Sequence, residues 1–218
     1  MNACLAATGY FDIDQPQIRT LAGELSAGRT DARDVAVSLY LWVRDNIRYN
    51  LYCFRAEPES FRASHCLAAG ESYCIPKAVL LGSLARAAGI PARLGLADVR
   101  NHLSSPQLLA FLRTDVFVMH GYTELWLNGH WIKATPAFNR ALCERMGVAV
   151  LAFDGEQDSV FQPFDQAGRR HMEYLQDHGT FADVPRALIV KRVAATYPHL
   201  LKQMGGTLQG RSLEQDLS

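Results

Sequence analysis

The hydrophobic pattern of this sequence changes its period at Pro91, and that change limits the fold more than any other feature. Before Pro91, apolar residues recur at three- and four-residue steps in residues 30–49 and in an Ala- and Leu-rich segment, residues 74–88. Thr30 is expected to cap the first helix, and Gly89 followed by Pro91 ends the second. The first part of the chain is therefore predicted to be helical.

After Pro91 the apolar residues alternate with a period near two. Four segments rich in aromatic and β-branched residues are predicted as strands: residues 92–98, 116–119, 122–127 and 131–135. Asn128-Gly129 between the last two predicts a type I′ hairpin. Residues 100–114 are expected to form a loop with one helical turn. Helices followed by an antiparallel sheet predict an α+β fold and not a βαβ series.

The C-terminal third has a weaker pattern. A short helix is expected at residues 141–146, a strand at 148–153 and a last helix at 185–197, while residues 154–179 form a polar stretch without a clear assignment. We expect one domain over residues 1–204, with a C-terminal extension from about residue 139. Residues 205–218 are rich in Gly, Gln and Ser and are expected to form a flexible tail.

Charge and composition exclude several classes of partner. The 218 residues contain 22 basic and 22 acidic side chains, so the chain has no excess of Lys and Arg to bind a phosphate backbone. No apolar run reaches the roughly 20 residues that cross a bilayer. The first fourteen residues do not resemble an export signal. The five cysteines are an odd number without paired short spacings, so free thiols and a cytoplasmic location are expected. We expect no nucleic acid or membrane partner and no cofactor.

Cys74 is the first candidate for chemistry, because it opens the second predicted helix. The unpaired N–H groups and the positive end of a helix dipole stabilise a thiolate. The alternative is a buried structural cysteine. His120, between two predicted strands, could act as the base and form a thiolate–imidazolium pair. Thr135, across the hairpin from His120, could accept the second imidazole N–H, although it brings no charge.

Five blocks of sequence together resemble the transglutaminase-like superfamily. They are residues 41–49 (LWVRDNIRY), 73–74 (YC), 87–93 (AAGIPAR), 120–124 (HGYTE) and 131–136 (WIKATP). The resemblance implies a papain-like core, in which a helix with a nucleophilic cysteine packs on an antiparallel sheet that bears the histidine and an acid. It also implies amide cleavage or acyl transfer, with Cys74 as nucleophile and His120 as base.

Two positions depart from the family pattern. Ser72 stands where a glycine is usual, and Thr135 stands where the family has its acid. A thiol nucleophile depends less on a charged third residue, as the Asn of papain-like enzymes illustrates. We therefore expect a catalytic triad of Cys74, His120 and Thr135. The substitute acids that remain open are Asp98, Asp115 and Asp154.

The sequence leaves the second oxyanion donor and the substrate open. The Cys74 N–H is one expected donor, and the candidates for the second are Tyr52, Tyr73 and Asn50. A cysteine hydrolase of an amide, ester or thioester is expected, with a small-molecule or peptide acyl substrate; the oligomeric state is not determined. An amine-accepting acyltransferase and an inactive binding module are the alternatives.

Other polar residues have weaker claims. A zinc site would use His65, Cys66, Cys74 and His102, but the spacing lacks CxxC or HxxxH. His102 either lines the same cleft or is a solvated loop residue. Glu124 lies four residues after His120 and either contacts this base or forms a structural pair with Lys133 across the hairpin, and the structural pair is expected. The arginines 93 and 100 are read as surface residues.

Overall fold

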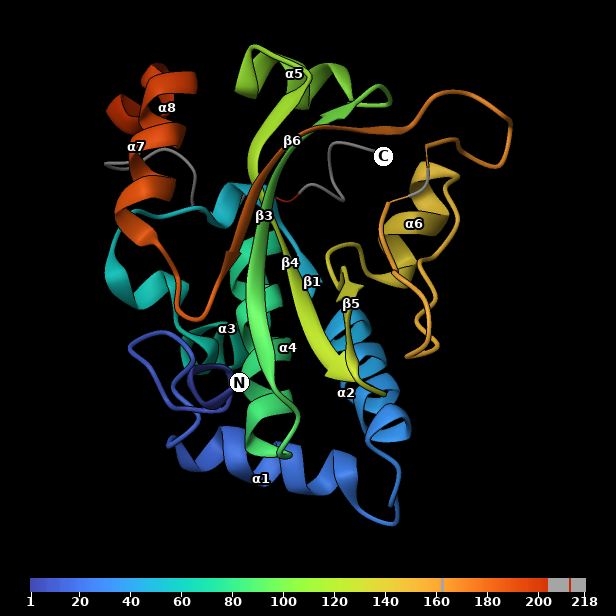
Figure 1. The fold of residues 1–218 in the computed structure, drawn as a ribbon. Coiled ribbons are helices and arrows are strands. Elements are labelled where there is room, and N and C mark those ends of the chain that lie inside the picture. Colours follow the sequence, from blue (N-terminus) through green and yellow to red (C-terminus); the bar gives the residue numbers. More distant parts are fainter. Residues whose placement is uncertain (162, 204–211, 213–218) are drawn as a thin grey trace.

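A single buried helix organises the structure. The computed structural model describes residues 1–161, 163–203 and 212, and its central helix is α4 (Cys74–Ala87). Every residue from Cys74 to Arg86 is buried, as expected of a helix that is apolar on all sides. α4 packs against α1 (Pro16–Ser26), α2 (Ala32–Asn46) and α3 (Ala63–Ala69), and also against the sheet, which lies in front of it in Figure 1.

The sheet is antiparallel, with strand order β5-β4-β3-β6. Its strands are β3 (Ala92–Asn101), β4 (Val116–Leu127), β5 (His130–Ala134) and β6 (Met172–Phe181). Asn128 and Gly129 have φ values of 51° and 86° and join β4 to β5, which confirms the predicted hairpin. The mixed helix and sheet architecture confirms the predicted α+β class.

β4 corrects one prediction, because residues 116–127 form one strand and not two. Ala97 pairs with His120 whereas Val99 pairs with Phe117, so β4 has one extra residue and bulges. Met119 lies in this bulge with φ 58°. The bulge interrupts the alternation of side chains, and this is why the sequence pattern breaks directly before His120.

Other predictions shift or fail. The first helix is capped by Asp31, whose carboxylate accepts the Arg33 N–H, and not by Thr30. Residues 148–153 form no strand, although Val148, Leu151 and Phe153 enter the core. β6 begins inside the polar stretch that had no assignment. The predicted tail at 205–218 lies outside the described residues apart from Ser212.

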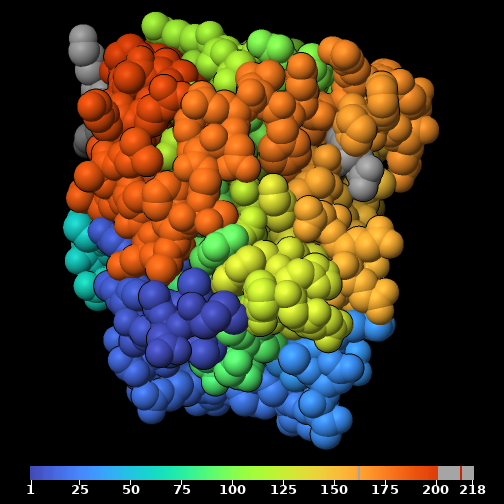
Figure 2. Space-filling view, viewed as in Figure 1, coloured from blue at the N-terminus to red at the C-terminus, as the bar shows by residue number. Residues whose placement is uncertain are grey.

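The remaining elements surround the two ends of the sheet. They are η1 (Asn2–Cys4), β1 (Arg48–Tyr49), η2 (Leu51–Cys53), η3 (Pro58–Phe61), β2 (Glu71–Ser72), α5 (Pro106–Leu112), α6 (Arg140–Met146), α7 (Arg186–Thr196) and α8 (Pro198–Gln203). β1 and β2 form a parallel pair directly before α4. α7 packs on β4, and the C-terminal helices form the upper left of the surface in Figure 2. Within the described residues, no helix has the length and apolar composition needed to cross a membrane.

Candidate active site

Cys74 lies at the first position of α4, as the sequence predicts. The preceding Tyr73 gives the helix no side-chain cap, so the first N–H groups of α4 remain available. The backbone N–H groups of Gly121, Ile75 and Cys74 itself lie near the Cys74 sulfur and act to lower its pKa. Such donors favour a thiolate over a thiol.

Gly121 brings His120 to the start of α4. A Cβ atom at Gly121 would lie only 2.8 Å from the Ile75 Cα, so β4 and α4 are in backbone contact there. Farther along, the Thr123 hydroxyl donates to the Ala78 carbonyl at 2.8 Å and holds the strand to the helix. The structure therefore places Cys74 and His120 on the wall of one cavity.

The cavity has a volume of about 70 Å³ and apolar walls. Leu51 and Phe54 form part of it, Phe111 and Leu112 come from α5, and other walls come from α7 and α8. Cys74 is 7% exposed and His120 is 4% exposed. Neither reacting group is therefore open to bulk water in this state.

Burial sets the protonation of the pair. It raises the pKa of Cys74 to about 11, although the three N–H groups oppose the rise, and it lowers the pKa of His120 to about 3. Burial thus favours a thiol and a neutral imidazole over the thiolate–imidazolium pair expected from the sequence. In that neutral form His120 takes the proton during attack.

Thr135 does not hydrogen-bond His120. It follows β5, and its N–H donates to the Ser159 carbonyl. Among the described residues, the buried Thr135 Oγ1 and His120 Nε2 have no partner in hydrogen-bond geometry, although Thr135 Oγ1 lies near the Tyr174 hydroxyl. The His120 ring instead packs at 4.9 Å from the Phe161 ring and 6.5 Å from the Tyr174 ring, measured between centroids. The Tyr174 hydroxyl lies between the Phe161 N–H and the Thr135 side chain. Aromatic packing thus orients the imidazole.

None of the three substitute acids contacts His120. Asp115 pairs with Arg100, and Asp154 accepts N–H groups of its own turn. Asp98 lies beside the bulge, where its carboxylate accepts the Met119 N–H at 2.9 Å. Within the described residues, no carboxylate is hydrogen-bonded to the imidazole of His120.

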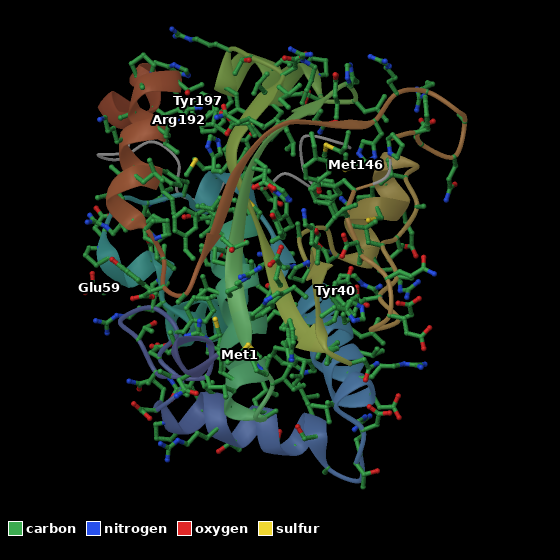
Figure 3. All side chains as sticks on the ribbon, viewed as in Figure 1. Met1, Tyr40, Glu59, Met146, Arg192 and Tyr197 are labelled. Carbon is green, nitrogen blue, oxygen red and sulfur yellow. The ribbon has the colours of Figure 1, made fainter. Side chains whose placement is uncertain are left out.

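Asp98 nevertheless acts near the site through the backbone. Its carboxylate oxygens lie 2.8 Å from His178 Nε2 and 2.9 Å from the Arg192 guanidinium. Arg192 comes from α7, near the upper end of the sheet in Figure 3. The cluster ties α7 and β6 to the bulge that precedes His120.

The structure distinguishes the three candidates for the second oxyanion donor. Tyr52 and Tyr73 line the cavity, whereas the Asn50 side chain accepts the Tyr52 N–H and contacts Glu71. The Tyr73 hydroxyl is buried without a hydrogen-bond partner among the described residues, and Cys74 contributes to raising its pKa. Tyr73 is therefore the candidate with a donor available.

Two other predictions are corrected or resolved. Glu124 pairs with Arg93 on β3 at 2.6 Å, and not with Lys133, because the neighbouring strand brings the guanidinium closer. His102 lies beside Glu173 at 3.0 Å and is absent from the cavity wall. In the described part of the chain, no three His, Cys, Asp or Glu side chains are grouped to hold a metal ion.

Comparison with known families assigns the segment that forms most of this site. The family model described as the transglutaminase-like superfamily matches residues 19–136, slightly more than half of the chain. The chain belongs to the transglutaminase-like superfamily. The matched segment contains Cys74, His120 and Thr135. Among curated proteins, none matches the sequence.

One solved structure supports the fold of this transglutaminase-like protein, and a second is a weaker match. A structure from Cytophaga hutchinsonii, which is named a "putative cysteine protease", superposes with a TM-score of 0.54 at 17% identity over 84% of this chain and 47% of that one. A structure from Parabacteroides distasonis ATCC 8503, named a "putative protease", has a TM-score of 0.40 at 15% identity, over 62% of this chain and 24% of that one. The chain thus spans about half the length of the first of these proteins.

Some residues of the site could not be predicted from the sequence. Phe161 and Tyr174 lie in the segment without a clear pattern, and nothing in their local sequence indicates contact with His120. Gly121 could have been identified from the sequence, because a glycine in a strand often marks a close approach of another backbone. The site therefore depends on contacts between distant segments.

Proposed function

We propose that the protein is a cysteine-dependent acyl-transfer enzyme, most simply a hydrolase of an amide, ester or thioester. The observation that carries the proposal is that the sulfur of Cys74 lies at the start of α4, near the N–H groups of Gly121 and Ile75, on the same cavity wall as the imidazole of His120. This arrangement prepares the sulfur to accept negative charge as it loses its proton.

The proposed reaction follows from the neutral resting pair. His120 takes the thiol proton as the Cys74 sulfur bonds to the substrate carbonyl carbon, and the carbonyl oxygen becomes an oxyanion. The Tyr73 hydroxyl and the Cys74 N–H are the donors available to it. The imidazolium then gives the proton to the leaving group, and an acyl-Cys74 thioester remains. His120 next deprotonates a water, which attacks the thioester and releases a carboxylic acid and the thiol.

Thr135 is proposed as a positioning residue and not as a substitute acid. Within the described part of the chain, its hydroxyl and His120 Nε2 are both buried without a partner in hydrogen-bond geometry, and each such group is costly to leave unpaired. A rotation of the imidazole during the reaction could join them. Thr135→Val should then lower the rate constant of acylation and leave KM unchanged, whereas equal kinetics would show that aromatic packing alone orients the ring.

The experiment that tests the proposal follows covalent acylation. The protein is mixed with p-nitrophenyl acetate, and intact and peptide mass spectrometry locate the acetyl group. Wild-type protein should acquire one acetyl group on Cys74 and release nitrophenolate repeatedly. His120→Ala should acylate at least about 100-fold more slowly, whereas Cys143→Ser, at a buried cysteine outside the cavity, serves as the matched control.

A binding module is the second candidate, and the neutral, carboxylate-free site favours it. That function predicts a cavity that binds ligand without turnover. Labelling of Cys74 at the same rate in His120→Ala and wild type, with no nitrophenolate release above the buffer rate, would support the binding module and refute the enzyme.

A further inference from the structure

The chemistry of the cavity wall restricts what can lie beside Cys74. Among the described residues that line it, none has a charged, amide or aliphatic hydroxyl side chain. The polar side-chain atoms on the wall belong to Cys74, His120 and tyrosines such as Tyr73. A charged group placed there would lose its water and gain no counter-charge, which is a large cost.

We propose that the acyl group transferred to Cys74 is short, apolar and uncharged, so that the substrates are esters, thioesters or amides of small aliphatic carboxylic acids. This inference rests on the proposed function. The transferred group fills the cavity and packs against side chains of α5 and the C-terminal helices. The polar leaving group lies outside the cavity.

The size of the cavity sets the length of the acyl group. Its volume of about 70 Å³ is roughly half of the 150 Å³ cavity that admits benzene in an engineered protein. A group with two to four carbon atoms is of the right scale, whereas longer chains must displace wall residues. Packed interiors resist such displacement.

The wall that limits the length comes from the C-terminal part of the chain. Val193 on α7, Tyr197 at its end and Leu200 on α8 face the cavity. The Tyr197 hydroxyl donates to the Val116 carbonyl at 2.6 Å and accepts the Val118 N–H at 2.9 Å, which holds this wall to β4. Figure 3 shows Tyr197 close to Arg192, beside the upper end of the sheet.

The same wall disfavours an acyl group that carries a second polar group, such as a carboxamide at its far end. A carboxamide has four hydrogen-bonding positions to satisfy, and the wall around the acyl group is mostly apolar. A buried amide without partners is disfavoured relative to water. The apolar cavity therefore selects a hydrocarbon acyl group over one with a polar end.

The experiment compares p-nitrophenyl esters that differ only in the acyl group. From acetate through propionate to butyrate, kcat/KM should rise about fourfold for each methylene, because a buried methylene contributes about 0.8 kcal/mol. The β-alanine ester, in which an ammonium replaces the terminal methyl of butyrate, should react at least about 100-fold more slowly than butyrate.

Two variants on α7 locate the wall. Val193→Ala should shift the optimum toward longer chains such as hexanoate, while Leu188→Ala, an exposed position of the same helix, should leave the profile unchanged. If Val193→Ala unfolds, the ester series on wild-type protein still decides the question.

The outcomes separate the two proposals. Acylation of Cys74 with no dependence on chain length, or with the β-alanine ester as fast as butyrate, would overturn the apolar specificity and leave the enzyme standing. Acylation by none of the esters would overturn both.

Discussion

Replacing Gly121 by alanine tests the contact that places the nucleophile beside the base. Gly121 does not have a positive φ, which would strain a side chain, so the substitution affects only the contact with Ile75. The new Cβ would lie 2.8 Å from the Ile75 Cα and 2.9 Å from its Cγ1. Apolar carbons rest about 3.5–4.0 Å apart, so β4 and the start of α4 must separate by roughly 0.7–1.2 Å. A Cα atom cannot rotate away, so the backbone itself has to move.

The expected costs follow from that displacement. Overpacking of this kind lowers the free energy of unfolding by about 1–3 kcal/mol. The Gly121 N–H also withdraws from the Cys74 sulfur, and a misplacement of about 1 Å between reacting groups reduces rate by about 100-fold. Urea unfolding measures the first effect, and acylation by p-nitrophenyl butyrate measures the second.

Gly23→Ala is the matched control. A Cβ at Gly23, inside α1, would meet nothing within 4 Å. This variant should be neutral or gain up to about 1 kcal/mol, because alanine suits a helix better than glycine. Wild-type stability and acylation in Gly121→Ala would refute the argument. Reduced stability with an unchanged rate would show that the contact supports the fold but not the site.

Three further predictions concern the surroundings of the site. Tyr197→Phe removes both hydrogen bonds to β4 and should lower the free energy of unfolding by about 1–2 kcal/mol. Iodoacetamide should also label Cys74 faster in this variant, and an unchanged labelling rate would mean that this wall does not cover the cavity. Burial lowers the pKa of Lys77 from 10.5 to about 7, so the unfolded chain binds more protons between these values and stability should rise with pH there relative to Lys77→Met; parallel urea midpoints at pH 7 and 9.5 would contradict this. Asp98→Asn weakens the support of the bulge at Met119, so kcat for butyrate hydrolysis should fall with KM unchanged, and a change in KM alone would argue against a positioning role.

The elements with strong local patterns were predictable. Residues 74–88 and the Asn128-Gly129 hairpin appear almost as predicted, since both depend on neighbours in the sequence. The structures of residues 148–153 and 172–181 were not predictable from local pattern. An edge strand such as β6 is defined by its pairing with β3 and not by its own composition. The bulge at Met119 depends likewise on Asp98, a residue of another strand.

The sequence by itself determined the class of the fold, the family resemblance and the candidacy of Cys74 and His120. These follow from periodicity and from the order of motifs along the chain. Only the tertiary structure decided their state, because burial raises the pKa of one group and lowers that of the other. It also decided that Thr135 Oγ1 lies near Tyr174 and makes no hydrogen bond to His120, and that apolar side chains from distant segments surround the sulfur. Burial and packing are properties of the folded assembly of segments, and no local pattern contains them.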